Sequence, residues 1–136
     1  MLVAVGIVEY GDRVLMRRRL PGSLYSGTWE FPMTPIDFGD TVEHSIESWV
    51  FESAGLRARS GLPGPAFDCK SLPGCRFFPV KMLPESPKLA TTGPNVCKWL
   101  KIKDLRRIKM SPPSVMYVKQ NEKISFLFKK VCLKTP

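Results

Sequence analysis

One stretch constrains the fold more than any other: the segment Val42–Ala54, whose pattern predicts an α-helix. Asp40 or Thr41 precedes it as a candidate N-cap, and Glu43 lies three residues after Asp40, as in a capping box. Gly55 follows, where a helix commonly ends in the left-handed conformation. At about 100° per residue, one side of the helix collects five side chains, those of Val42, Ile46, Trp49, Val50 and Ser53. The pattern therefore predicts a helix with one buried face.

Apolar, β-branched stretches alternate with Gly-, Pro- and Ser-rich ones through the rest of the chain. The first of them predict a hairpin, with strands 3–10 and 13–17 joined by a turn at Gly11 and Asp12. Further strands are predicted at 28–31, 67–70, 75–82 and 96–102, separated by loops at 20–27, 32–39, 60–65 and 83–95. A helical turn is predicted at 104–108 and a helix at 113–119, while 124–131 fits strand and helix equally.

The composition indicates one basic globular domain spanning residues 1–136. Hydrophobic residues make up 43% and charged residues 24%, as in ordinary soluble proteins. Lys and Arg outnumber Asp and Glu by 21 to 12, a net charge of +9 that attracts nucleotides, polyphosphates or nucleic acid without choosing among them. The excess is heaviest at 17–19 and 98–134, with a basic C-terminal segment from about residue 121.

The cysteines indicate whether the chain can bind zinc, and the first residues and the apolar runs indicate where the protein is located. The four cysteines form no CxxC pair and His44 is the single histidine, which argues against a zinc site and for reduced thiols. No uncharged apolar run approaches the roughly 18 residues of a membrane span. The first residues lack a basic region and a cleavage site and are typical of a strand. We therefore expect a cytoplasmic protein with no membrane contact.

The order of these features resembles the MutT/Nudix family: a hairpin, the strand end Trp29-Glu30-Phe31-Pro32, a loop, and a capped helix that ends in Gly55-Leu56. The family signature is Gly-x5-Glu-x7-Arg-Glu-U-x-Glu-Glu-x-Gly-U, where U is a bulky aliphatic residue. Its final Gly-U falls on Gly55-Leu56, and Trp99 through Asp104-Leu105 resembles the Trp-x4-Asp-Leu that follows the last core strands. The resemblance covers roughly residues 3 to 120. It implies the α/β Nudix fold, a mixed β-sheet flanked by helices in an α/β/α sandwich.

The same alignment shows a degenerate Nudix box. The three helix glutamates that hold magnesium in the family correspond to Trp49, Glu52 and Ser53, and the arginine that braces them corresponds to Ser48. Magnesium requires oxygen ligands, and two of these three positions no longer hold a carboxylate. Two other helix acids, Glu43 and Glu47, project roughly 140° or more away from Glu52. The resemblance thus implies that magnesium-dependent pyrophosphate hydrolysis is weak or lost.

Three hypotheses remain open from the sequence. In the first, the chain binds nucleoside diphosphate-X or nucleoside triphosphate compounds near Arg19 and Trp49 with little or no hydrolysis. In the second, it is an active pyrophosphohydrolase in which Glu52 and Asp40 are catalytic and Glu52, Asp40 and Asp37 hold Mg²⁺. In the third, the basic surface binds nucleic acid or a protein, although no nucleic-acid-reading motif is present. A homodimer is compatible with all three.

Overall fold

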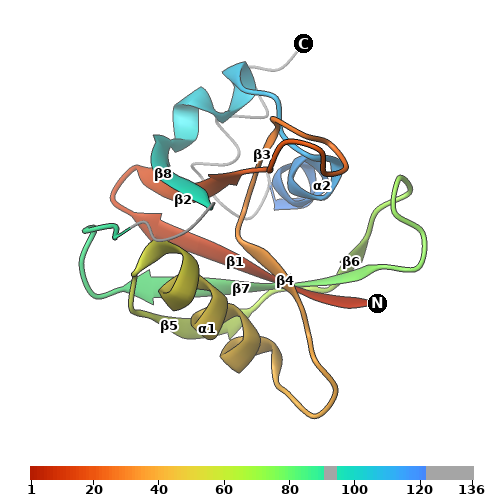
Figure 1. Cartoon of the computed structure of the whole chain (residues 1–136), viewed down its shortest axis with the longest axis horizontal. Helices are drawn as coiled ribbons and strands as arrows, with labels where there is room; N and C mark the ends of the chain where they lie inside the picture. Colours follow the sequence, from red (N-terminus) through yellow and green to blue (C-terminus); the bar gives the residue numbers. More distant parts are fainter. Residues whose placement is uncertain (91–94, 122–136) are drawn as a thin grey trace.

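The computed structural model describes residues 1–90 and 95–121. Its centre is a mixed sheet (Figure 1), with strands β1 (Leu2–Tyr10), β2 (Arg13–Arg18), β3 (Trp29–Glu30), β4 (Met33–Pro35), β5 (Ala58–Pro63), β6 (Phe67–Asp68), β7 (Arg76–Pro84) and β8 (Val96–Lys101). The helices are α1 (Val42–Ala54), α2 (Pro112–Asn121) and the 3-10 helix η1 (Ile102–Arg107). The main strand order is β3-β2-β1-β7-β5, while β4 pairs with β1, β6 with β7 and β8 with β2.

The central strand β1 explains why helices cover both faces of the sheet. It runs parallel to β7 and antiparallel to β2 and β4. Because side chains alternate along a strand, Val3, Val5 and Ile7 join the apolar cluster that includes α2, whereas Ala4 and Val8 join the cluster that includes α1. A strand buried on both faces needs a continuous apolar run, which β1 has. The structure confirms the predicted fold class, a mixed sheet flanked by helices.

Helix α1 begins and ends where the sequence predicts. Thr41 is the N-cap, and its hydroxyl accepts a hydrogen bond from the His44 backbone N–H at 3.1 Å. Gly55 ends the helix at φ 65°, and its N–H donates to the Phe51 carbonyl at 2.9 Å. A Cβ at Gly55 would lie 2.6 Å from Ala90 Cβ, so both the backbone angle and the available space require glycine there.

The structure selects Thr41 over Asp40 as the cap, so a capping box between Asp40 and Glu43 is wrong. Asp40 lies one residue earlier. Its Oδ1 accepts from the Thr41 N–H at 2.8 Å and lies 2.8 Å from His44 Nδ1, while Oδ2 accepts from the Ser45 hydroxyl at 3.1 Å. The Thr41 N–H lowers the pKa of the Asp40 carboxyl, and the bonds with His44 and Ser45 add to this effect. Asp40 therefore stabilises the start of α1.

Two strands lie where the sequence predicts loops. β4 occupies part of the predicted loop 32–39; it has three residues, ends at Pro35 and pairs with β1. β5 overlaps the predicted link 60–65 and forms one end of the main strand order, beside β7. It contains Gly61 and Pro63, and its register shifts between Ser60 and Pro63. Edge strands tolerate Gly and Pro, which is why composition alone points to a loop.

The remaining predicted elements are confirmed, with ends that differ by a few residues: the hairpin, the short strand at 28–31, the three later strands, the helical turn and the second helix. Most of the basic segment from about 121, including the undecided stretch 124–131, lies outside the described residues. In the described part, no helix is both long and apolar enough to cross a membrane. The described cysteines, Cys69, Cys75 and Cys97, are free thiols.

Candidate functional site

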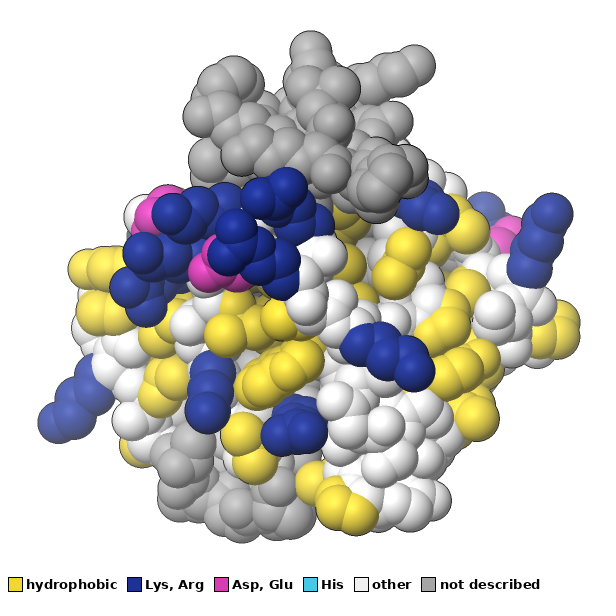
Figure 2. Space-filling model, turned by 90° about the horizontal axis from the view of Figure 1, so that it is seen from above, with side chains coloured by type: hydrophobic (Ala, Val, Ile, Leu, Met, Phe, Trp, Pro, Cys, Tyr) yellow, Lys and Arg dark blue, Asp and Glu magenta, His cyan; other side chains and the backbone are white. Residues whose placement is uncertain are grey.

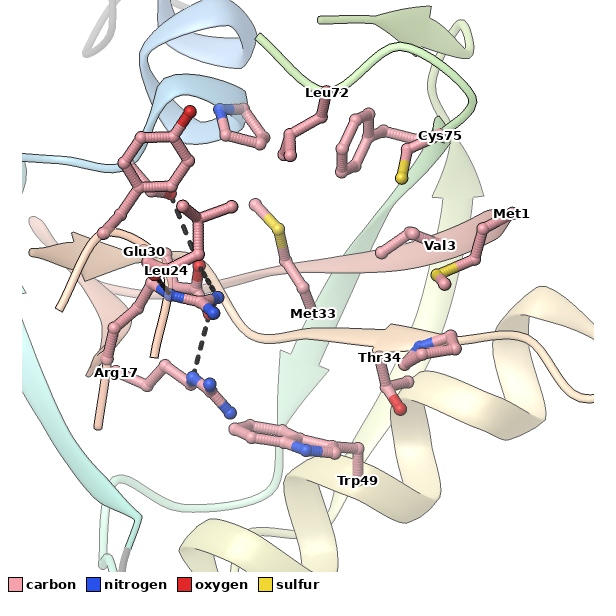
Figure 3. Close-up of a pocket in the computed structure, with 16 residues that line it drawn as sticks. Met1, Val3, Arg17, Leu24, Glu30, Met33, Thr34, Trp49, Leu72 and Cys75 are labelled. Atoms are coloured by element: carbon pink, nitrogen blue, oxygen red, sulfur yellow. Dashed lines mark hydrogen bonds and ion pairs between the residues drawn. The ribbon is translucent and has the colours of Figure 1, made fainter. Parts of the chain in front are cut away.

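A pocket of about 390 Å³ opens among strands β1 to β4, helix α1, the segment that leads into β7 and the start of α2 (Figure 3). Its apolar and aromatic walls include Leu24, Tyr25, Met33, Trp49, Leu72, Phe77 and Pro113. Arg17, Arg19 and Glu30 supply charged groups on the same lining. Apolar walls with a few convergent polar groups are typical of a small-molecule site.

Glu30 lies between two arginines. Its Oε2 is 2.9 Å from Arg17 Nε, an ion pair without the alignment of a hydrogen bond. Arg19 Nη1 donates to Glu30 Oε1 at 3.1 Å and lies 3.3 Å from Oε2. The Ser111 hydroxyl donates to Oε1 at a longer 3.4 Å. The Glu30 side chain is only 3% exposed, against 15% for Arg17 and 25% for Arg19. One buried carboxylate thus fixes two guanidinium groups at the pocket wall.

Strand register produces this arrangement. Arg17 in β2 pairs directly with Glu30 in β3, and directly paired residues of antiparallel strands place their side chains on the same face. Arg19 follows Arg17 by two residues, the period at which strand side chains return to one face. The loop after β2 holds Arg19 further, because Arg19 Nε donates to the Leu24 carbonyl at 2.5 Å. β3 is itself anchored to the segment before α2, since the Ser111 N–H donates to the Trp29 carbonyl at 2.9 Å.

Trp49 brings α1 to this site. Arg17 Cζ lies 5.3 Å from the centroid of the indole, within the range of a cation–π interaction, and Figure 3 shows the guanidinium beside the ring.

Cys97 of β8 pairs with Arg17 on the other side of β2. Burial raises the pKa of the Cys97 thiol, and the charge of Arg17 only partly offsets this rise. The thiol is therefore protonated at neutral pH and unsuited to act as a nucleophile.

The structure brings two of the predicted site residues together and separates the others from them. Arg19 and Trp49 both line the pocket, and their role in ligand binding stays a prediction. Asp40 is engaged at the start of α1, and Asp37 and Glu52 are exposed; none of the three belongs to the pocket lining. Within residues 1–90 and 95–121, no three His, Cys, Asp or Glu side chains gather closely enough to hold a metal ion. The catalytic and metal roles of Glu52, Asp40 and Asp37 stay predictions.

The residues at the signature positions do not fit a divalent cation. Trp49 offers no oxygen, and its ring has a guanidinium beside it. Ser53 is 5% exposed, and its hydroxyl accepts a hydrogen bond from Asn95 Nδ2 at 3.3 Å. Hard cations require several oxygen ligands, and carboxylates supply them best. Of the three signature positions, only Glu52 carries such a group.

The sequence did not identify as site residues the polar group around the buried carboxylate, which consists of Arg17, Glu30 and Ser111. The two-residue spacing of Arg17 and Arg19 within a predicted strand was an available signal for a shared face. The pairing of Arg17 with Glu30 depends on the β2–β3 register, and the hydrogen bond of Ser111 with Glu30 depends on tertiary packing. Neither follows from local sequence.

Solved structures resemble the chain, although no protein-family model and no curated protein sequence matches it. It is similar to a NUDIX hydrolase from Nitrosomonas europaea, with a TM-score of 0.77 and 11% identity over 99% of this chain and 73% of that one. An ADP-ribose pyrophosphatase from Streptococcus suis gives a TM-score of 0.64 at 14% identity, over 97% and 87% of the two chains. A MutT structure from work on Aliivibrio salmonicida and Vibrio cholerae gives 0.61 at 18%, over 88% and 96%. The chain has the Nudix fold, and the predicted resemblance is confirmed at that level.

Proposed function

We propose that the pocket binds a nucleotide, or a closely related phosphorylated small molecule, and that hydrolysis of the pyrophosphate is weak or absent. The observation that supports this most strongly is the pair of guanidinium groups that Glu30 holds at the pocket wall, 2.9 and 3.1 Å from its carboxylate oxygens. Arginine is well suited to phosphate because its planar group offers five N–H donors in a fixed geometry.

The donor count leaves room for a ligand. Contacts with described residues use Nε of Arg17 and Nε and Nη1 of Arg19. The other terminal nitrogens of both side chains can donate to phosphate oxygens. The aromatic walls, Tyr25 and Trp49, and the apolar Met33 match a heterocyclic base or another flat group. An ADP-ribose pyrophosphatase is among the structurally similar proteins, which is consistent with this ligand class.

The second half of the proposal rests on α1. Trp49 and Ser53 stand at two of the three positions where the signature has glutamates, so Glu52 is the one carboxylate at these positions. Loss of a positioned catalytic base lowers rates by about 10²–10⁴, and loss of metal ligands adds to that. The alternative, an active hydrolase that uses Glu52, Asp40 and Asp37, requires a rearrangement that brings these three acids together.

The basic surface and the pocket are formed by different residues, so binding by each can be tested separately. Seen from above, Lys and Arg side chains gather over η1 (Figure 2), where Lys103, Arg106 and Arg107 are exposed. None of these three residues lines the pocket. Replacement of Arg106 removes the same charge as replacement of a pocket arginine, so Arg106→Gln is a matched control.

Isothermal titration calorimetry with ATP, ADP-ribose, a dinucleoside polyphosphate and a nucleotide sugar tests the proposal, with and without Mg²⁺. We expect at least one ligand to bind, and Arg19→Gln to weaken it about 10- to 100-fold, the effect of one or two lost charge-assisted hydrogen bonds. Arg106→Gln should leave the affinity unchanged within about twofold. No binding by any ligand, or equal losses in the two variants, would contradict the proposal.

A further inference from the structure

The side of α1 that should face a metal ion faces a fixed organic cation. Trp49 stands at a signature glutamate position, and Arg17 Cζ lies 5.3 Å from its ring centroid. We propose that this pocket takes its phosphorylated ligand free of divalent cation, with the Arg17 guanidinium supplying the positive charge that magnesium supplies in the signature, and that Mg²⁺ weakens binding. This inference rests on the proposed function, because it concerns the form in which the same ligand binds.

The carboxylate nearest to these arginines cannot also serve a metal ion. Glu30 is 3% exposed, with Arg17 and Arg19 within 3.1 Å of its oxygens and Ser111 at 3.4 Å. A metal ion that used Glu30 would have to displace both guanidinium groups. The two arginines and Glu30 together leave one net positive charge on this wall. Such a wall attracts a phosphate and repels a dication.

Arg17 is held as a fixed charge. Its side chain is 15% exposed, ion-paired with Glu30 at 2.9 Å and beside the Trp49 indole. The Glu30 contact uses only Nε, and within residues 1–90 and 95–121 both terminal nitrogens remain for a ligand. A cation bound to the ligand phosphates would share this space with an immobile guanidinium that lies in a partly desolvated pocket, where like charges repel more strongly than in water. The preferred ligand is therefore the metal-free polyanion.

ATP is the probe, because it binds Mg²⁺ tightly. Free ATP and its Mg²⁺ complex differ by two units of charge. Calorimetry compares its affinity in EDTA with its affinity in excess MgCl₂, with the ionic strength matched by NaCl. We expect affinity about tenfold lower with Mg²⁺, a difference of roughly 1.4 kcal/mol. Equal or higher affinity with Mg²⁺ would overturn this inference and leave the proposed function intact. If neither ATP nor any other nucleotide of the ligand panel binds in either buffer, the proposed function fails as well.

Two variants test the role of Arg17 and α1. Arg17→Gln should weaken ATP in EDTA and reduce the Mg²⁺ effect to less than about threefold, since the repelling charge is gone. Arg106→Gln should keep the full effect. Trp49→Glu combined with Ser53→Glu restores three carboxylates together with Glu52 and should make Mg²⁺ favour binding. If that double variant does not fold, Arg17→Gln decides: an unchanged Mg²⁺ effect there would refute the assignment to Arg17.

Discussion

The two sides of the pocket differ in the chemistry they offer. On the β2–β3 side, Arg17 and Arg19 are held by the buried carboxylate of Glu30. On the α1 side, the pocket is lined by Trp49, at a position that our sequence alignment matches to a metal-binding glutamate of the Nudix signature. The first side has what a phosphate site requires, whereas the second lacks what a magnesium site requires.

This difference shows that a chain can adopt a family's fold without the metal-binding residues of the family's signature. Helix α1 has 13 residues between its Thr41 cap and its Gly55 terminus, and it packs against the sheet. Packing depends on Ile46, Val50 and other buried positions, and Trp49, at a signature position, packs against the same cluster with an indole in place of a carboxylate. Fold similarity therefore shows the scaffold, and binding or turnover in this cavity has to be argued from the residues that line it.

The largest expected effect is on the β2–β3 side. Glu30→Ala leaves two partly buried guanidinium groups beside each other without their shared carboxylate. We expect the free energy of unfolding to fall by about 3 kcal/mol, since removal of one partner of a buried pair typically costs that much. Urea denaturation measures it. The control Glu85→Gln, at an exposed carboxylate, should change stability by no more than about 0.5 kcal/mol. A Glu30→Ala effect as small as that would show that Glu30 does not organise the site.

A smaller effect is expected on the α1 side. Trp49→Ala removes the ring beside Arg17, an interaction of about 1 kcal/mol. We expect the ligand affinity to fall roughly three- to tenfold, while Trp49→Phe, which keeps an aromatic face, recovers most of it. Calorimetry with the best ligand of the panel tests this. If Trp49→Phe and Trp49→Ala weaken ligand binding equally, the aromatic face at position 49 does not position Arg17.

The smallest effect concerns Asp40, which the structure gives a helix-stabilising role. Its folded-state pKa is lowered, so its stabilisation is present above the unfolded-state pKa and is lost as the pH falls through the folded value. Asp40→Asn should therefore lower the Tm at pH 7 and have less effect near pH 3, as thermal melts at both pH values will show. It should leave ligand affinity unchanged. A large loss of affinity would instead support a site role for Asp40.

Local patterns in the sequence predicted much of this fold. Apolar periodicity, Thr41 and Gly55 define α1 to the residue, and the Gly11 turn defines the first hairpin. β4 and β5 escaped prediction because Pro35, Gly61 and Pro63 obscure short strands that exist only through pairing with β1 and β7. Local composition contains no information about such partners.

The site, like the fold, was predicted where local sequence carries the information and was missed where tertiary pairing does. The wider family resemblance identified Arg19 and the alignment to the signature identified Trp49, and both residues line the pocket. Glu30 was part of a quoted strand motif, yet its role depends on the register that places it opposite Arg17. Ser111 reaches the site from more than eighty residues away in the sequence. Charge and spacing identify candidates, while tertiary pairing determines which of them meet.

The most direct test of the account is turnover. The purified protein is incubated with Mg²⁺ or Mn²⁺ and with nucleoside triphosphates, dinucleoside polyphosphates and nucleotide sugars, and released phosphate and pyrophosphate are measured beside the Glu52→Gln variant. We predict that the two proteins release product at the same slow rate, because Glu52 is the one carboxylate at the three glutamate positions of the signature. Rapid, metal-dependent release that Glu52→Gln abolishes would contradict the account and establish an active pyrophosphohydrolase.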